Sequence, residues 1–212
     1  MARYDELHNA VIYGRKAKVP ALVQQQLDEG RSAKEVMDEG LIPGMTVVGK
    51  KFQEGEFFIP EMLMAARSLN AGLDLLKPLL VASEFKPVAK VVMGTVKGDI
   101  HDIGKNLVSI MLRGGGFEVI DAGVDVPPDK FVALVKESGA ELVGLSALLT
   151  TTMPAMQDTI EAFASDGSRD QVKIMIGGAP ITQNYADEIG ADGFARNASF
   201  AVDLAKKLLE AA

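Results

Sequence analysis

Residues 89–115 read AKVVMGTVKGDIHDIGKNLVSIMLRGG, which is an apolar run, a polar loop and then a helical pattern. The run AKVVMGT is typical of a buried strand, whereas IGKNLVSIMLRGG has its apolar residues at helical spacing. The loop between them carries His101, one of only two histidines in the chain, and it lies close to Asp99 and Asp102. The stretch therefore predicts a βα unit with an unusual histidine in its turn.

The same alternation of strand and helix repeats four more times toward the C-terminus. The further strand candidates are FEVIDAG, ELVGLSA, VKIMIGG and ADGFA, and a helical pattern follows each of them. Five βα units in succession are typical of an α/β fold with a parallel sheet and helices on both faces. Residues 88–212 are therefore expected to form a doubly wound, five-stranded parallel domain of the Rossmann or flavodoxin-like kind.

The residues before this region show only helical spacing. In FFIPEMLMAARSLNAGLDLLKPLL (57–80) the apolar residues recur in steps of three and four, and Pro78 is expected to kink or end this helix. Ser32 is expected to cap a shorter helix, with Glu35 completing a capping box. Residues 1–85 are therefore expected to form a helical bundle.

Composition limits the function classes that the chain can belong to. It has 212 residues with a net charge of −7, which argues against nucleic acid as a partner because phosphate binding needs clustered basic residues. It has no cysteine, which excludes disulfides, thiolate metal sites, iron–sulfur clusters and cysteine nucleophiles. No apolar run is long enough to span a membrane and the first residues lack a signal-peptide layout, so we expect a cytoplasmic location with no membrane partner.

The loops that follow the strands have an unusual composition. In a doubly wound sheet, ligands bind beyond the carboxyl ends of the strands, where the strand order reverses. The first loop carries His101, the third carries hydroxyl residues from Ser146 to Thr152, and the fourth begins with Gly177 and Gly178. A histidine–carboxylate pair, hydroxyl donors and bare backbone at three strand ends indicate a binding cleft.

Three interpretations of the histidine loop come from its residues alone. Asp99 or Asp102 could simply cap the following helix. Asp99, His101 and Asp102 could form a metal site, but three adjacent ligands cannot close a structural zinc site and no second cluster is obvious. A phosphate loop is the third interpretation, and the glycines at 98 and 104 have the wrong spacing for it.

A fourth interpretation comes from resemblance to a known family. The motifs are Asp99-x-His101-x-x-Gly104, then Ser146-x-Leu148, then Gly177-Gly178. Their order and their places after the first, third and fourth strands resemble the cobalamin-binding domains of methionine synthase and of the methanol, methylamine and O-demethylase corrinoid proteins. The helical half resembles the bundle that precedes this domain in the family, so the resemblance runs from about Tyr4 to the end.

The resemblance implies a role for each motif residue. His101 would be the lower axial ligand of the cobalt in cobalamin, in the base-off, histidine-on form, and Asp99 would accept the other ring N–H of the histidine. Thr152 stands where methionine synthase has a serine and would complete a ligand–carboxylate–hydroxyl relay. The residues implied in cofactor binding in this domain are Asp99, His101, Gly104, Ser146, Leu148, Thr150, Thr152, Gly177 and Gly178.

The helical bundle gains a role from the same resemblance. Bundles of this family cover the methyl-bearing face of the corrin ring with apolar side chains, and the residues that match are Phe52, Phe58, Ile59 and Met62. Such a cover would shield the reactive cobalt and would have to move aside for a partner. The segment LLVASEFKPVAK (79–90) is the expected hinge.

The resemblance implies a corrinoid methyl carrier of one-carbon metabolism that is not catalytic alone. After a bundle and a cobalamin domain, nothing remains of the chain for a substrate barrel. One partner methyltransferase would load a methyl group onto cobalt, a second would pass it to tetrahydrofolate or a thiol, and a reductive activase would restore oxidised cobalt.

Other functions remain open at this stage. A cobalamin-dependent sensor or regulatory protein would share both halves, the small subunit of an adenosylcobalamin mutase would share the α/β half, and a flavodoxin-like module would leave His101 unexplained. The sequence does not specify the methyl donor, the final acceptor or the oligomeric state.

Overall fold

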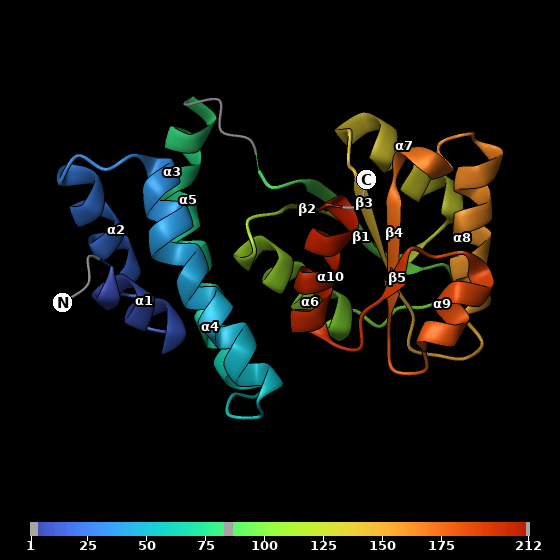
Figure 1. The fold of residues 1–212 in the computed structure, drawn as a ribbon, viewed down its shortest axis with the longest axis horizontal. Coiled ribbons are helices and arrows are strands. Elements are labelled where there is room, and N and C mark those ends of the chain that lie inside the picture. Colours follow the sequence, from blue (N-terminus) through green and yellow to red (C-terminus); the bar gives the residue numbers. More distant parts are fainter. Residues whose placement is uncertain (1–3, 83–86, 211–212) are drawn as a thin grey trace. The chain divides into compact units, whose positions relative to one another are not determined.

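The computed structural model describes residues 4–82 and 87–210. The chain divides into two compact units, Met1–Pro87 with Gly114–Gly116, and Val88–Arg113 with Phe117–Ala212 (Figure 1). Residues 83–86 of the expected hinge lie outside the described residues, so the hinge stays a prediction.

The first unit is helical, as the spacing of its apolar residues predicts. Its elements are α1 (Asp5–Ile12), α2 (Val19–Asp28), α3 (Ala33–Glu35), the π-helical segment η1 (Val36–Leu41), α4 (Ile42–Gln53) and α5 (Ile59–Ala82). The side chain of Ser32 caps α3 by accepting a hydrogen bond from the N–H of Glu35 at 3.1 Å. The cap by Ser32 is the one expected from the sequence, whereas the bond from the Ser32 N–H to the Glu35 side chain that would complete a capping box stays a prediction. The Glu35 carboxylate accepts a bond from the Tyr4 hydroxyl.

The segments α3, η1 and α4 follow one another without a break and form one continuous helix. Pro43 has no N–H to donate to the carbonyl of Glu39 four residues earlier. The ring Nε2 of His8 lies 2.7 Å from that carbonyl oxygen. The residues around Glu39, Val36–Leu41, take the wider spacing of a π-helix. His8 thus has a local structural partner within the helical unit.

Helix α5 buries the face that its periodicity predicts. Met62, Ala65, Leu69 and Leu76 are fully buried. Pro78 does not end the helix, which continues to Ala82, so that part of the expectation is wrong. The reason is that proline removes one hydrogen-bond donor, and the helical residues on both sides supply enough other bonds to continue the helix.

The second unit is the predicted doubly wound sheet. Its five strands are parallel and lie in the order β2-β1-β3-β4-β5. The elements are β1 (Lys90–Val96), α6 (Ile103–Gly114), β2 (Glu118–Val126), α7 (Pro128–Ser138), β3 (Leu142–Ser146), α8 (Pro154–Ser165), η2 (Arg169–Gln171), β4 (Lys173–Gly177), α9 (Gln183–Ile189), β5 (Gly193–Phe194) and α10 (Ala198–Glu210). The fold class expected from the sequence is confirmed.

Alternate residues of each strand enter the two cores of this unit. Val92 and Val143 pack with Phe131 of α7 and Phe163 of α8 on one face, where α9 also lies. On the opposite face the strand residues pack against α6 and α10, and this smaller core includes Val91, Met93, Leu142, Met175, Leu112 and Ala205 (Figure 1). Helices therefore cover both faces, which leaves the carboxyl edge of the sheet for the loops.

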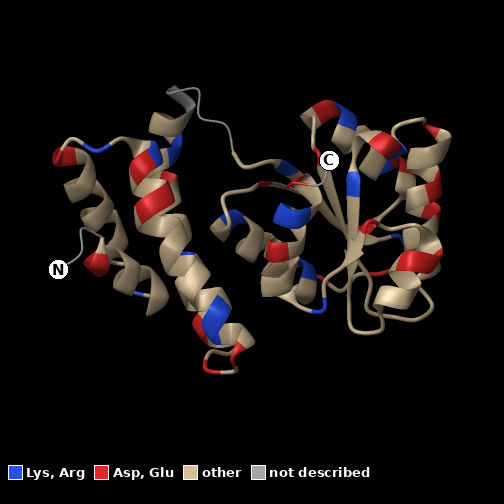
Figure 2. Cartoon of the chain, viewed as in Figure 1, with Lys and Arg blue, Asp and Glu red and all other residues tan. Residues whose placement is uncertain are grey.

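Charges are distributed over both units. Lysines and arginines are interspersed with aspartates and glutamates along the helices of each (Figure 2). Among the described helices, none combines the length and the apolar character that crossing a membrane requires.

Candidate functional site

The strand order reverses between β1 and β3, so the loops after these two strands diverge from adjacent points. Thr95 near the end of β1 pairs with Ser146 at the end of β3, and Ser146 pairs with Gly177 at the end of β4. Three of the loops chosen from the sequence therefore begin at one row across the carboxyl edge of the sheet.

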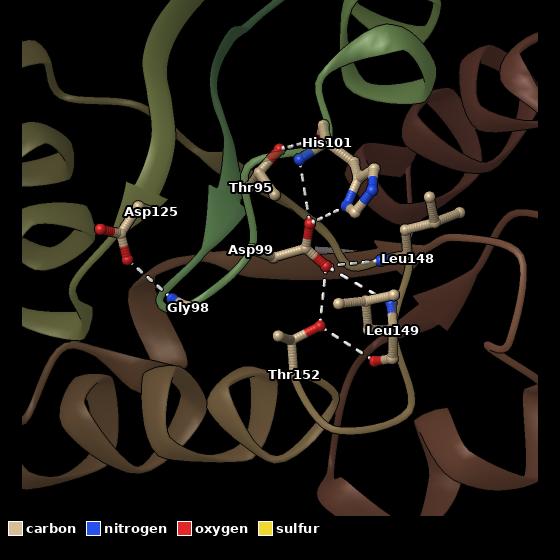
Figure 3. Close-up of polar contacts among 8 residues, drawn as sticks. All are labelled: Thr95, Gly98, Asp99, His101, Asp125, Leu148, Leu149 and Thr152. Atoms are coloured by element: carbon tan, nitrogen blue, oxygen red, sulfur yellow. Dashed lines mark hydrogen bonds and ion pairs between the residues drawn. The ribbon is translucent and has the colours of Figure 1, made fainter.

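The side chain of Asp99 lies at the centre of these loops and is buried. Its Oδ1 accepts bonds from the backbone N–H of His101 at 3.0 Å and from His101 Nδ1 at 2.7 Å (Figure 3). Its Oδ2 accepts bonds from the N–H of Leu148 at 2.8 Å and the hydroxyl of Thr152 at 2.7 Å, with the N–H of Leu149 further off at 3.4 Å. One carboxylate thus joins the loop after β1 to the loop after β3.

These hydrogen bonds keep the Asp99 carboxylate ionised. Burial by itself raises the pKa of a carboxyl group, and it is the largest influence on Asp99. The bonds donated by the His101 and Leu148 N–H groups, the Thr152 hydroxyl and the His101 ring together outweigh it. The pKa of Asp99 is therefore held well below its usual value, and the carboxylate is an acceptor for all of its partners.

The ring of His101 is oriented by this contact. Because an ionised carboxylate can only accept, Nδ1 carries the hydrogen and Nε2 carries the lone pair in the neutral ring. The side chain is 46% exposed, and no described residue bonds to Nε2. The arrangement presents a fixed imidazole nitrogen with a free lone pair, which is the arrangement of a metal-binding histidine with its supporting carboxylate.

The backbone around His101 is held at several points. The buried hydroxyl of Thr95 donates to the carbonyl oxygen of His101 at 2.8 Å. Asp125, near the end of β2, accepts from the N–H of Gly98 at 2.7 Å and donates its own N–H to the carbonyl of Asp99 at 2.8 Å. Sequence reasoning did not single out Thr95 or Asp125, because the signal for them is strand register and not a motif.

Asp102 has a local partner. Its Oδ2 accepts a bond from the Asn106 side chain at 3.0 Å, and its carbonyl accepts from the Asn106 N–H at 2.8 Å. Both contacts lie at the start of α6, in keeping with a role at the helix terminus. No group of three or more metal-ligating side chains is gathered within residues 4–82 and 87–210.

The glycines expected in the cleft differ in how much space surrounds them. Gly104 is exposed, and a Cβ added there would meet nothing within 4 Å. At Gly178 an added Cβ would collide with the carbonyl oxygen of Ala147, and φ is +143°. At Gly177 it would lie 3.1 Å from the carbonyl of Ala195. Gly178 is therefore needed for the close approach of two loops, whereas Gly104 leaves open space beside the histidine.

The remaining candidates of this unit border the same loops. Ser146 is half-buried at the end of β3, Leu148 is exposed and Thr150 is exposed. Large aliphatic side chains are exposed on or beside the loops that contain His101, Asp125 and Thr152, namely Ile100, Ile103, Val124, Leu148 and Leu149. An open imidazole nitrogen on loops with exposed aliphatic side chains fits a metal whose other ligands belong to a macrocycle.

The four residues expected to cover the corrin belong to the helical unit. Phe58 and Ile59 are exposed, Phe52 is half-buried and Met62 is fully buried. Phe58 and Ile59 are thus available to a ligand, whereas Met62 serves the core of its own unit. A covering role for any of them stays a prediction.

Comparison with known families gives two matches. Models described as a B12 binding domain match residues 89–203 and residues 3–77. The first match covers the α/β region that holds His101, and the second covers most of the helical region.

Individual proteins agree with the family matches. The chain is 47% identical over 206 residues to dimethylamine corrinoid protein 2 of Methanosarcina acetivorans, covering 97% of this chain and 95% of that protein. A solved cobalamin-binding protein from Desulfitobacterium hafniense is 35% identical, with a TM-score of 0.80 and 98% of both chains covered. In the methanol:cobalamin methyltransferase complex MtaBC of Methanosarcina barkeri, a chain 28% identical gives a TM-score of 0.88, covering 98% of this chain and 81% of that one.

Proposed function

The chain belongs to the family of B12-binding corrinoid proteins of methyltransferase systems, and from this premise we propose that it carries a methyl group on the cobalt of a bound cobalamin. The observation that carries the proposal is the His101 ring, fixed by Asp99 at Nδ1 and open at Nε2. The relatives are named corrinoid proteins, which favours a carrier over the sensor or regulatory alternative.

His101 is the residue that would bind cobalt, in the base-off, histidine-on form. When bound, the corrinoid supplies the cobalt atom that accepts and releases the methyl group. Asp99 holds the hydrogen on Nδ1 of the ring and so keeps the lone pair on Nε2. Thr152 donates to the other oxygen of the same carboxylate, which limits how far Asp99 can turn.

The remaining motif residues would receive the nucleotide tail of the cofactor. Ser146 offers a hydroxyl at the row of strand ends, and Gly104 leaves space beside the start of α6. Leu148, Thr150, Gly177 and Gly178 border the same loops. Gly178 is required for the close approach of two loops whether or not a cofactor binds, and the Thr150 side chain is exposed.

Phe52, Phe58, Ile59 and Met62 would exclude water from the methyl-bearing face. Phe58 and Ile59 are the stronger candidates because their side chains are exposed, whereas Met62 is buried. A movable apolar cover would protect the reactive cobalt and then expose it to a partner.

Two kinds of methyltransferase are the proposed partners. The first would transfer a methyl group from a small methylated substrate, and the dimethylamine corrinoid proteins among the relatives make a methylated amine the first donor to test. The second would pass the methyl group to tetrahydrofolate or a thiol, and a reductive activase would complete the system.

Reconstitution with hydroxocobalamin tests the proposal. We expect the corrinoid to stay with the protein through gel filtration and to show the visible spectrum of an imidazole-ligated cobalt. His101→Ala should retain less corrinoid and lose that spectrum. Since the chain has only two histidines, His8→Gln is the matched control and should behave as the natural protein does.

Two results would overturn the proposal. Failure of the natural protein to retain a corrinoid would remove the function, and an unchanged ligand spectrum in His101→Ala would remove the role of His101.

A further inference from the structure

Asp125 has an unusual backbone. Its φ is +51°, and it is the only residue other than glycine with a positive φ in the described part of the chain. Side chains other than glycine avoid this left-handed region because Cβ then approaches the backbone, although asparagine and aspartate tolerate it best. Such a conformation persists only where surrounding contacts enforce it.

The pairing of β1 with β2 explains how Asp125 comes to this position. Gly94 pairs with Gly123 and Val96 pairs with Val126, so β2 has one residue more than β1 between the two pairs. This extra residue forms a bulge, and bulges commonly re-aim side chains beside functional sites. In Figure 3 the carboxylate of Asp125 points at the N–H of Gly98.

Two hydrogen bonds then join Asp125 to the histidine loop in opposite senses. The Gly98 N–H donates to Asp125 Oδ1 at 2.7 Å, and the Asp125 N–H donates to the carbonyl of Asp99 at 2.8 Å. The two bonds hold the Gly98–Asp99 segment at its two ends, the N–H of Gly98 and the carbonyl of Asp99. The direction of the Asp99 side chain, and through it the direction of the His101 ring, depends on that backbone.

We propose that Asp125 is a positioning residue for the cobalt ligand: its strained backbone and carboxylate clamp the Gly98–Asp99 segment and thereby aim Nε2 of His101. This inference rests on the proposed function of His101 as the axial ligand. It adds a third layer behind the ligand, in the order His101, Asp99, Asp125, with the third residue contributed by a neighbouring strand.

Two substitutions test the carboxylate of Asp125 without adding strain to its left-handed backbone. Asp125→Gly accepts the left-handed conformation and keeps the N–H bond to Asp99, but it removes the acceptor for the Gly98 N–H. Asp125→Asn keeps a side-chain oxygen as that acceptor and also tolerates positive φ. Asp102→Asn removes a carboxylate from the same loop without touching the clamp, and it is the matched control for charge.

The test is displacement of the histidine by cyanide from each variant reconstituted with hydroxocobalamin, followed in the visible spectrum. In Asp125→Gly we expect the half-maximal cyanide concentration to fall by about tenfold, the order expected for loss of a hydrogen bond to a charged group. Asp125→Asn and Asp102→Asn should stay near the natural protein. The Asp125→Gly apoprotein should still unfold in one cooperative transition, because relief of the strained φ by glycine offsets part of the stability lost with the hydrogen bond.

Hydrogen exchange of the Gly98 amide gives a second readout that needs no cofactor. In the apoprotein this amide should exchange faster in Asp125→Gly than in Asp125→Asn, while the core of the sheet is unaffected. An Asp125→Gly protein that resists cyanide as the natural protein does would overturn the clamp. A natural protein without histidine ligation would instead overturn the proposed function, so the two failures are distinguishable.

Discussion

At the scale of single residues, the site depends on one buried carboxylate that satisfies several donors at once. Asp99 accepts from its own loop through Oδ1 and from the loop after β3 through Oδ2. A buried charge is tolerated only when it is paired with donors in this way. The same bonds that keep Asp99 ionised therefore fix the ring of His101.

Substitution of Thr152 tests how much its hydroxyl contributes to holding the Asp99 carboxylate. Its hydroxyl lies 2.7 Å from Asp99 Oδ2 and 2.9 Å from the Leu149 carbonyl, and it has one hydrogen to donate. We expect Thr152→Val, which keeps the shape, to lower the free energy of unfolding by roughly 1–3 kcal/mol because a buried carboxylate loses a donor. Denaturant unfolding of the apoprotein measures this change.

Thr152→Ser is the matched control for that substitution. It keeps the hydroxyl and loses only a methyl group, so it should unfold near the natural protein and retain the histidine-ligated spectrum. Equal losses in the valine and serine variants would mean that the methyl group, and not the hydroxyl, supports Asp99.

The residues of the site differ in how far the sequence could predict them. Asp99 and His101 lie two residues apart, so their contact follows from a local motif. Thr152 and the Leu148 N–H reach Asp99 from about fifty residues away. The strand order placed the loop with Thr152 in the cleft, but only the resemblance to a known family linked Thr152 to Asp99. Asp125 could not be found, because its place depends on a bulge that shifts strand register without leaving a motif.

At the scale of elements, Gly178 lies where the loop after β4 passes close to the loop after β3. An added Cβ would collide with the Ala147 carbonyl, and φ is +143°. We expect Gly178→Ala to lower the free energy of unfolding by roughly 3–5 kcal/mol, from backbone strain and overpacking together. Denaturant unfolding measures this loss.

Gly190 supplies the control for the glycine substitution. It ends α9 with φ +74°, but a Cβ added there would meet nothing within 4 Å. Gly190→Ala should cost only about 1–2 kcal/mol for the left-handed backbone. If both variants lost the same amount, the close approach of the two loops would not be the reason for Gly178.

The contact between α6 and β2 predicts a pH-dependent stability. Lys105 is buried and pairs with Asp121. Burial raises the pKa of Asp121, but the hydrogen bond and charge of Lys105 and the N–H of Gly123 outweigh it, so the pKa lies below the usual value of 3.8. A carboxyl with a lowered folded pKa stabilises the fold above its unfolded pKa and loses that contribution as the pH falls through the folded pKa.

Asp121→Asn tests this pH dependence. We expect the apoprotein to lose stability as the pH is lowered from 7 to 3, and the asparagine variant to lose less over that interval while being less stable at pH 7. Thermal melting across the pH range measures both effects. The exposed Asp203→Asn on α10 should melt in parallel with the natural protein, and an Asp121→Asn curve that also ran parallel would remove the role of the pair.

Most helices and strands were predictable because the spacing of their apolar residues in the sequence matches the helical or strand period. The five strands alternate between two cores, and the helices of both units have one buried face. The error falls where a proline interrupts a period. Pro78 does not end α5, because the other hydrogen bonds of the helix on both sides of it are sufficient to continue the helix.

At the scale of the whole molecule, the family matches cover residues in both units. The α/β unit contains the complete support of His101. The helical unit carries exposed aromatic and aliphatic residues at the turn before α5 and at its start, Phe58 and Ile59. A cover of the cofactor by the helical unit is therefore a property that only the full chain can test.

Hydrogen exchange of the full chain with and without hydroxocobalamin provides that test. Binding of a ligand protects the backbone that it contacts or orders. We expect slower exchange in the loops around His101 and Leu148, and also in residues 52–62 of the helical unit.

Phe58→Ala should reduce the protection of residues 52–62 without changing that of the His101 loop. Tyr13→Ala, which removes another exposed aromatic residue of the same unit, should leave both regions protected, because Tyr13 is not among the residues proposed to cover the cofactor. Protection confined to the α/β unit would mean that cobalamin is held by that unit alone and that the helical unit does not cover it.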